Sequence, residues 1–121
     1  MNRMKLGLLT MLTLIVSSVT LAAVANSAAT AQTVRITEVS NGIRFSAKPK
    51  AGVVKLQVRN ISDDAHDFWL KGGGKTWKTR VLGGSQVASL TAKLKKGTRY
   101  TFWCSIGDHR QEGMAGSFVA R

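Results

Sequence analysis

The chain has 121 residues with a single cysteine, and its 18 Lys and Arg against 6 Asp and Glu give a net charge of +12. This length suits one small domain behind an N-terminal leader, and the lone cysteine excludes a disulfide within the chain. The basic residues are scattered along the sequence instead of clustered, which argues against a nucleic-acid partner.

The first 31 residues have the pattern of a secretory signal peptide. Two basic residues precede the apolar run 6–16, and an Ala-x-Ala motif at 29–31 predicts cleavage before Gln32. A retained membrane anchor is the alternative, because the apolar stretch extends toward Val24, near the ~20 residues that a membrane span needs. We therefore predict an exported protein, periplasmic or otherwise extracytoplasmic, whose mature domain spans 32–121 with a net charge of +10.

Alternation of apolar and polar residues begins at residue 33 and predicts β-strands through the mature chain. The strands 33–39 and 42–47 flank Asn41-Gly42, whose tolerance of positive φ predicts a tight hairpin turn. A strand at 53–60 follows, with its valines and leucine on one face. Further strands are predicted at 66–70, 78–82, 86–94, 99–104 and 116–120.

Seven or eight short strands without a helical period predict an all-β domain, a single antiparallel Greek-key sandwich or barrel. The stretch GGGKT at 72–76 has the ending of a phosphate-binding loop, but the glycine that should stand five residues before Gly74 is replaced by Trp69. We therefore interpret these glycines as a flexible crossover.

The scarce metal-binding side chains of the mature chain form one complete set of two imidazoles, one thiolate and one thioether. Such a set holds a blue copper centre, with three strong ligands near one plane and a weak axial methionine. Zinc is less suitable because its sites seldom recruit a thioether. Alone, a buried cysteine is usually a small hydrophobic residue, but together these side chains predict one type 1 copper ion. The predicted ligands are His66, Cys104, His109 and Met114.

The stretch YTFWCSIGDHRQEGMAGSF at 100–118 resembles the C-terminal copper loop of cupredoxins, in which an aromatic-rich strand leads to Cys, His, Gly-Met and Gly. The upstream stretch VRNISDDAHDFWL at 58–70 is similar to the family segment in which a strand ending in Asn, here Asn60, leads to the first His ligand. The resemblance covers nearly all of residues 33–121. It implies a cupredoxin-like fold and assigns the four copper ligands to the same residues.

Two positions depart from this resemblance. Gly107 stands where many members have proline, which leaves the unfolded loop freer at a cost of up to ~1 kcal/mol and predicts a less rigid loop. Asp67 stands where many members have Asn after the first His ligand, and its negative charge predicts a lower reduction potential.

The expected function is single-electron transfer between redox partners, with copper cycling between Cu(II) and Cu(I). No histidine remains for a second copper site or for acid–base chemistry, so we expect a carrier and not an enzyme. His109 resembles the ligand through which cupredoxins exchange electrons, and the resemblance implies a second route through Trp103, which alternation turns outward beside Cys104.

The positive charge favours docking to an acidic redox protein, such as a c-type cytochrome or an oxidoreductase, or to an anionic membrane surface. We expect a monomer. Two other functions stay open: a copper carrier or storage protein without redox shuttling, and a metal-free basic docking module of the same fold.

Overall fold

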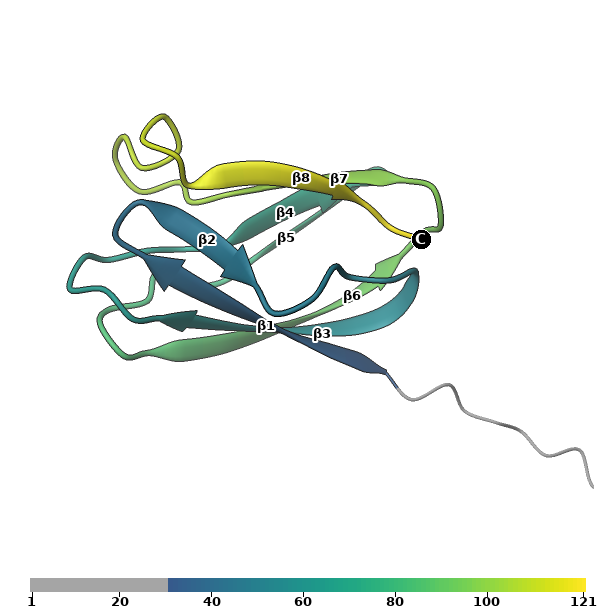
Figure 1. Cartoon of the computed structure of the whole chain (residues 1–121), viewed down its shortest axis with the longest axis horizontal. Helices are drawn as coiled ribbons and strands as arrows, with labels where there is room; N and C mark the ends of the chain where they lie inside the picture. The colour runs from purple at the N-terminus through teal and green to yellow at the C-terminus, as the bar shows by residue number, and fades with distance from the viewer. Residues whose placement is uncertain (1–30) are drawn as a thin grey trace, which may run out of the picture.

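A computed structural model describes residues 31–121, so the predicted signal peptide lies outside the described part of the chain except for Ala31. Within residues 31–121 no helix is long and apolar enough to cross a membrane. Eight strands pack as two layers (Figure 1): β1 (Gln32–Val39), β2 (Gly42–Phe45), β3 (Gly52–Asn60), β4 (Trp69–Gly72), β5 (Lys75–Lys78), β6 (Val87–Leu94), β7 (Arg99–Trp103) and β8 (Ala115–Val119).

The two sheets have four strands each, in the orders β2-β1-β3-β6 and β5-β4-β7-β8. The predicted all-β sandwich is confirmed, although the pairing is not wholly antiparallel, because β1 and β3 run parallel. The chain doubles back after β2 through residues 46–51, so β3 starts at the same end of the sheet as β1.

The core lies between the sheets and follows the predicted alternation. Val54, Leu56 and Val58 of β3 are fully buried, as the sequence pattern required. Each such side chain stabilises the fold by roughly 1.5–3 kcal/mol through burial. Phe102 of β7, in the second sheet, packs against Phe45 of β2, in the first, with ring centroids 4.7 Å apart.

Two predicted turns differ from the structure. The β1–β2 hairpin turns at Ser40 and Asn41, since Val39 pairs with Gly42, and Asn41 has no positive φ. The stretch 72–74 is no flexible crossover but a two-residue hairpin turn, with Gly73 at φ +59° and Gly74 at φ +76°. Both central positions are left-handed, a conformation that glycine adopts without strain.

Two predicted strands also start or end elsewhere. The tight turn at Gly73 places β5 at Lys75–Lys78, so most of the predicted strand 78–82 lies outside the sheet. Beyond Lys78, the end of β5, Leu82 forms an isolated bridge to His66. The predicted strand 66–70 likewise joins the sheet only from Trp69, so His66 lies on the connection that leads into β4.

Candidate metal centre

Three of the predicted ligands meet at one end of the sandwich. His66 comes from the β3–β4 connection, while Cys104 and His109 come from the β7–β8 loop at the same end (Figure 1). The Nδ1 atoms of the two histidines lie 3.2 Å apart, and the Sγ of Cys104 lies 3.8 Å from His66 Nδ1 and 3.6 Å from His109 Nδ1. The structure therefore gathers these side chains as the sequence predicted.

This triangle has the size that a first-row transition metal needs. A point equidistant from the three donor atoms lies about 2.1 Å from each, close to the ~2.0–2.1 Å of a metal–imidazole bond and a little short of a metal–thiolate bond. Two imidazoles and one thiolate around such a point form the trigonal set of a blue copper centre. The donor atoms fit copper before any rearrangement.

A hydrogen-bonded chain orients His66. Its Nε2 lies 2.8 Å from the Oγ of Ser62, so Nε2 carries the proton and Nδ1 is left free for a metal. The Ser62 hydroxyl in turn donates to Asn60 Oδ1 at 2.9 Å. Asn60 is itself fixed, because its Nδ2 donates to the carbonyls of Asp64 and Leu82 at 2.6 and 2.9 Å. Asn60, predicted beside the metal site, therefore positions His66 through Ser62.

The β7–β8 loop holds the other donors through its own backbone. The N–H of His109 donates to Ile106 O at 3.1 Å, and the N–H of Met114 donates to His109 O at 2.9 Å. Gly107 has φ +48°, which proline cannot reach because its ring fixes φ near −65°. The loop is thus a different turn from one built around proline.

Met114 is fully buried next to the other predicted ligands. Its carbonyl accepts the N–H of Cys104 at 3.0 Å, and this bond closes the base of the loop. The two glycines around it permit this packing: Gly113 adopts φ +118°, and a Cβ on Gly116 would lie 2.5 Å from Phe102 Cζ. Its role as the axial ligand stays a prediction.

Asp67 joins the two ligand-bearing segments. It lies on the connection just before β4, which begins at Trp69, and it is only 5 % exposed. Its Oδ1 accepts the N–H of Ser105 at 2.6 Å, and its Oδ2 accepts the Ser105 hydroxyl and the Trp69 indole N–H, the latter at 2.9 Å. Donors converge on both oxygens, so a carboxylate suits this position better than an amide.

The same end of the sandwich shifts the pKa values of three groups. Burial, followed by the neighbouring charge of His109, lowers the pKa of His66 and favours the neutral imidazole that binds metals. Burial raises the pKa of the Cys104 thiol, although backbone N–H groups of Asp67 and Ile106 oppose the shift. Metal binding near neutral pH must therefore release the thiol proton.

Glu38 is a buried carboxyl for which the sequence predicted no role. It is fully buried near the end of β1, and within residues 31–121 neither carboxyl oxygen has a hydrogen-bond partner. Burial, and to a lesser extent the charge of Asp67, raise the pKa of Glu38 to about 7.

Trp103 lies half-buried on the outer face of β7 and packs on a second tryptophan. Its ring stacks on Trp69 with centroids 5.7 Å apart and an interplanar angle of 21°. Lys78 lies over Trp69 and Arg110 over Trp103, each 4.8 Å from the ring centroid. The pairing of Trp69 with Trp103 across β4 and β7 makes this contact.

Sequence reasoning missed Ser62, Ser105 and Trp69. For Ser62 a signal was present, because an Asn followed two residues later by Ser is a common turn motif, and Ser62 N–H indeed donates to Asn60 Oδ1 at 2.9 Å. For Ser105 and Trp69 no local signal exists, since both reach Asp67 through the fold.

Solved structures share this fold. A dithionite-reduced auracyanin from the photosynthetic bacterium Roseiflexus castenholzii is 17 % identical with a TM-score of 0.61, covering 75 % of this chain and 98 % of its own. Auracyanin B is 19 % identical with a TM-score of 0.61, covering 75 % and 89 %. Auracyanin A, described as a "blue" copper protein of Chloroflexus aurantiacus, is 16 % identical with a TM-score of 0.60, covering 74 % and 98 %.

No protein-family model and no curated protein sequence matches the chain. The likeness to the auracyanins therefore lies in the fold, and the predicted cupredoxin-like architecture is confirmed.

Proposed function

We propose that the protein is an exported blue copper electron carrier, and one observation carries this proposal. The triangle formed by His66 Nδ1, His109 Nδ1 and Cys104 Sγ has the dimensions of a trigonal copper site. The shared fold with a protein described as a blue copper protein supports it. Copper, when bound, supplies a one-electron couple between its cupric and cuprous states.

The protein's contribution is to fix the donor atoms in both states. His66 is held by Ser62 on one side and by backbone hydrogen bonds to Leu82 on the other, at 3.0 and 2.6 Å. Cys104 starts the loop at the end of β7, where its N–H is bonded to Met114 O. Because these positions are set by the fold, electron transfer requires little movement of the protein.

Electrons leave and enter mainly through His109. Its side chain is half-buried, whereas His66, Cys104 and Met114 are fully buried, so among the predicted ligands His109 offers a path to the surface. A second path runs from Cys104 to its covalent neighbour Trp103 and across the stacked ring of Trp69. The flanking cations Lys78 and Arg110 suit an acidic redox protein at this face.

The spectrum of the copper-loaded protein tests the proposal. Addition of cupric ion to the purified mature protein, residues 32–121, is expected to give an intense thiolate-to-copper charge-transfer band in the visible region and reversible one-electron cycling in voltammetry. Cys104→Ser removes the thiolate and should abolish the band. Its matched control is Ser105→Cys in the Cys104→Ser background, which restores a thiol one residue away and should not restore the band.

Other outcomes decide among the alternatives. Tight copper binding without the charge-transfer band or reversible cycling would indicate a copper carrier or storage protein. Absence of copper binding would leave only a docking module and would refute the proposal.

A further inference from the structure

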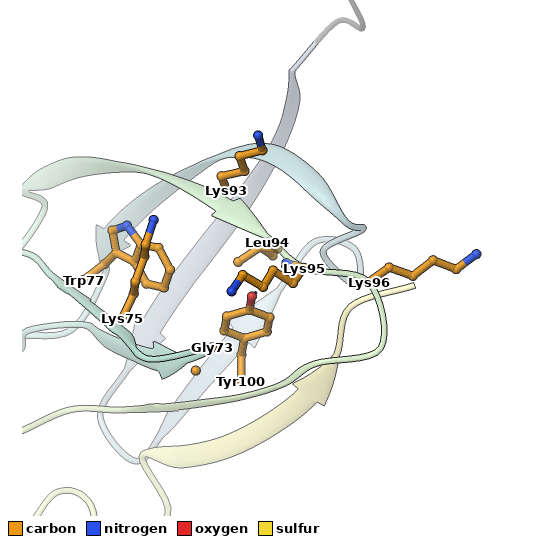
Figure 2. Close-up of a pocket in the computed structure, with 9 residues that line it drawn as sticks. Gly73, Lys75, Trp77, Lys93, Leu94, Lys95, Lys96 and Tyr100 are labelled. Atoms are coloured by element: carbon orange, nitrogen blue, oxygen red, sulfur yellow. Dashed lines mark hydrogen bonds between the residues drawn. The ribbon is translucent and has the colours of Figure 1, made fainter.

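A cavity of about 480 Å³ lies at the end of the sandwich opposite the metal centre, between the β4–β5 turn and the start of β7 (Figure 2). None of the residues that line it is acidic. The side chains that define it are four lysines and two aromatic rings: Lys75, Lys93, Lys95, Lys96, Trp77 and Tyr100.

The wall of this cavity is fixed by close packing. Tyr100 is 1 % exposed, and its hydroxyl accepts the N–H of Lys95 at 2.8 Å. Its ring lies against the bare backbone of Gly72, where a Cβ would come within 2.5 Å of the ring. In Figure 2 the side chains of Lys75 and Lys95 lie at the cavity beside the rings of Trp77 and Tyr100, while Lys96 extends away from it. Lys75 and Lys95 therefore flank a site that is lined by the buried ring of Tyr100 and the partly exposed ring of Trp77.

The acidic side chains are confined to one end of the molecule, whereas basic side chains occur at both. All six Asp and Glu side chains of the chain lie toward the metal centre. They occur near the end of β1, in the β3–β4 connection and in the β7–β8 loop: Glu38, Asp63, Asp64, Asp67, Asp108 and Glu112. The opposite end carries the four lysines of the cavity without a compensating carboxylate side chain, so an anionic surface would attract that end.

The chemistry of the cavity indicates its ligand. Lysine ammonium groups bind phosphate as point charges, and aromatic side chains with one polar edge occur where an apolar layer meets water. A volume of about 480 Å³ suits a small group. A phosphate with an adjoining apolar part, as in the headgroup region of an anionic lipid, meets all of these features.

The start of β1 lies at the same end of the domain as the cavity, which is consistent with a lipid ligand there. β1 begins at this end with Gln32, whose Oε1 accepts the N–H of Lys50 at 2.8 Å. The apolar run 6–16 precedes that point in the sequence. In the alternative in which this run is retained as a membrane anchor, it would bring this end toward the lipid.

We propose that the lysine-rich end docks on an anionic membrane surface, that the cavity between Trp77 and Tyr100 receives a lipid phosphate, and that the metal centre consequently faces away from the membrane. This docking does not depend on the metal or on electron transfer.

Vesicle binding by the full chain tests the proposal. Phosphatidylcholine vesicles measure any contribution of the apolar N-terminal segment, and vesicles that also contain phosphatidylglycerol measure the anionic term. One lysine near such a surface contributes about 1 kcal/mol, or roughly fivefold, so Lys75→Gln with Lys95→Gln should weaken binding to the anionic vesicles about 25-fold. The matched control, Arg59→Gln with Lys78→Gln, removes the same charge from the half of the domain near the metal centre and should weaken it less than about fivefold. Equal losses in the two variants, or no preference for anionic vesicles, would overturn the proposal.

The three tryptophans report the orientation. In bicelles with a spin-labelled headgroup, and with ascorbate to keep any copper cuprous, the indole N–H signal of Trp77 should broaden before those of Trp69 and Trp103. Earlier broadening of the Trp69 and Trp103 signals would place the membrane near the metal centre instead of at the cavity. A Trp77 shift that inorganic phosphate reproduces fully would assign the cavity to a soluble phosphate. The same shift with polyglutamate, but not with lipid, would assign it to an acidic protein. Each of these outcomes contradicts the proposal.

Discussion

His66 and His109 face the same point, but the protein holds them in different ways. His66 is fully buried, bonded through its backbone to Leu82 and through its ring to Ser62. His109 is half-buried on a loop whose hydrogen bonds are local, and within residues 31–121 its Nε2 has no recorded partner. One imidazole is thus held by contacts to other segments of the fold, and the other lies on a loop and is partly exposed.

Asp67 connects these two halves of the site. It follows His66 directly and accepts hydrogen bonds from Ser105, which follows Cys104. A single carboxylate therefore sets the distance between the His66 side and the His109 side. Substitutions on the His66 side, on the His109 side or at Asp67 should therefore show what each contributes to the metal site.

The largest effect is expected from Gly107→Pro, which disrupts the His109 side. Proline cannot adopt φ +48°, so the turn that leads to His109 cannot form and the blue copper spectrum should be lost. Thermal unfolding of the metal-free domain should change little, because the loop lies outside both sheets. Gly107→Ala is the control: a Cβ there meets nothing within 4 Å, and the left-handed backbone costs only about 1 kcal/mol. A normal spectrum in the proline variant would contradict this account.

Ser62→Ala tests the His66 side. The Nε2–H of His66 loses its acceptor, and removal of such a partner typically weakens metal affinity 10- to 100-fold. Competition with a copper chelator would measure the change. Ser89→Ala is the matched control, since Ser89 is exposed on β6, and it should leave the affinity unchanged. An equal affinity in both variants would show that Ser62 does not position His66.

Glu38→Leu should stabilise the metal-free protein by about 1–3 kcal/mol at pH 8, because it removes a buried carboxyl that has no hydrogen-bond partner among residues 31–121. The folded pKa is raised from 4.5 to about 7, so this carboxyl destabilises the fold progressively as the pH rises from 4.5 to 7. The advantage of the leucine variant in urea unfolding should therefore grow between pH 5 and pH 8. Glu38→Gln should remove the pH dependence with a smaller gain, and a pH-independent difference would contradict the assigned pKa.

Asp67→Asn should lower stability by about 1 kcal/mol, because the asparagine Nδ2 cannot accept the Trp69 indole N–H. The reduction potential should rise, since a negative charge near the metal is removed, and voltammetry would measure it. In the Trp69→Phe background the same substitution should cost less stability. An unchanged potential would count against the effect of Asp67 on the metal.

Much of the fold and of the metal site could be predicted from the sequence. The inward faces of β1 and β3 followed directly from alternation, because each sheet has one buried face. The ligand set followed from scarcity, since His66 is the only histidine besides His109.

The rest depended on tertiary geometry. The burial of Asp67 could not be predicted, because it precedes β4, and regular strand alternation begins only at Trp69. The role of Gly107 was predicted only in part. A glycine in place of proline suggested a more flexible loop, whereas its positive φ shows that the loop adopts a specific turn. The cavity near Tyr100 likewise joins residues from β4 to β7 that no local pattern connects.

The position of β1 has a consequence for folding. As an inner strand between β2 and β3, it closes the edges of both neighbours. Its parallel pairing with β3 joins segments about twenty residues apart in sequence, and sheets built on such non-local contacts fold slowly, in milliseconds to seconds. Until β1 docks, β3 exposes an apolar strand edge that could pair with another chain. We therefore expect the incompletely folded chain to self-associate through the edge of β3. This tendency should end when β1 pairs with β3, whether or not the metal is bound.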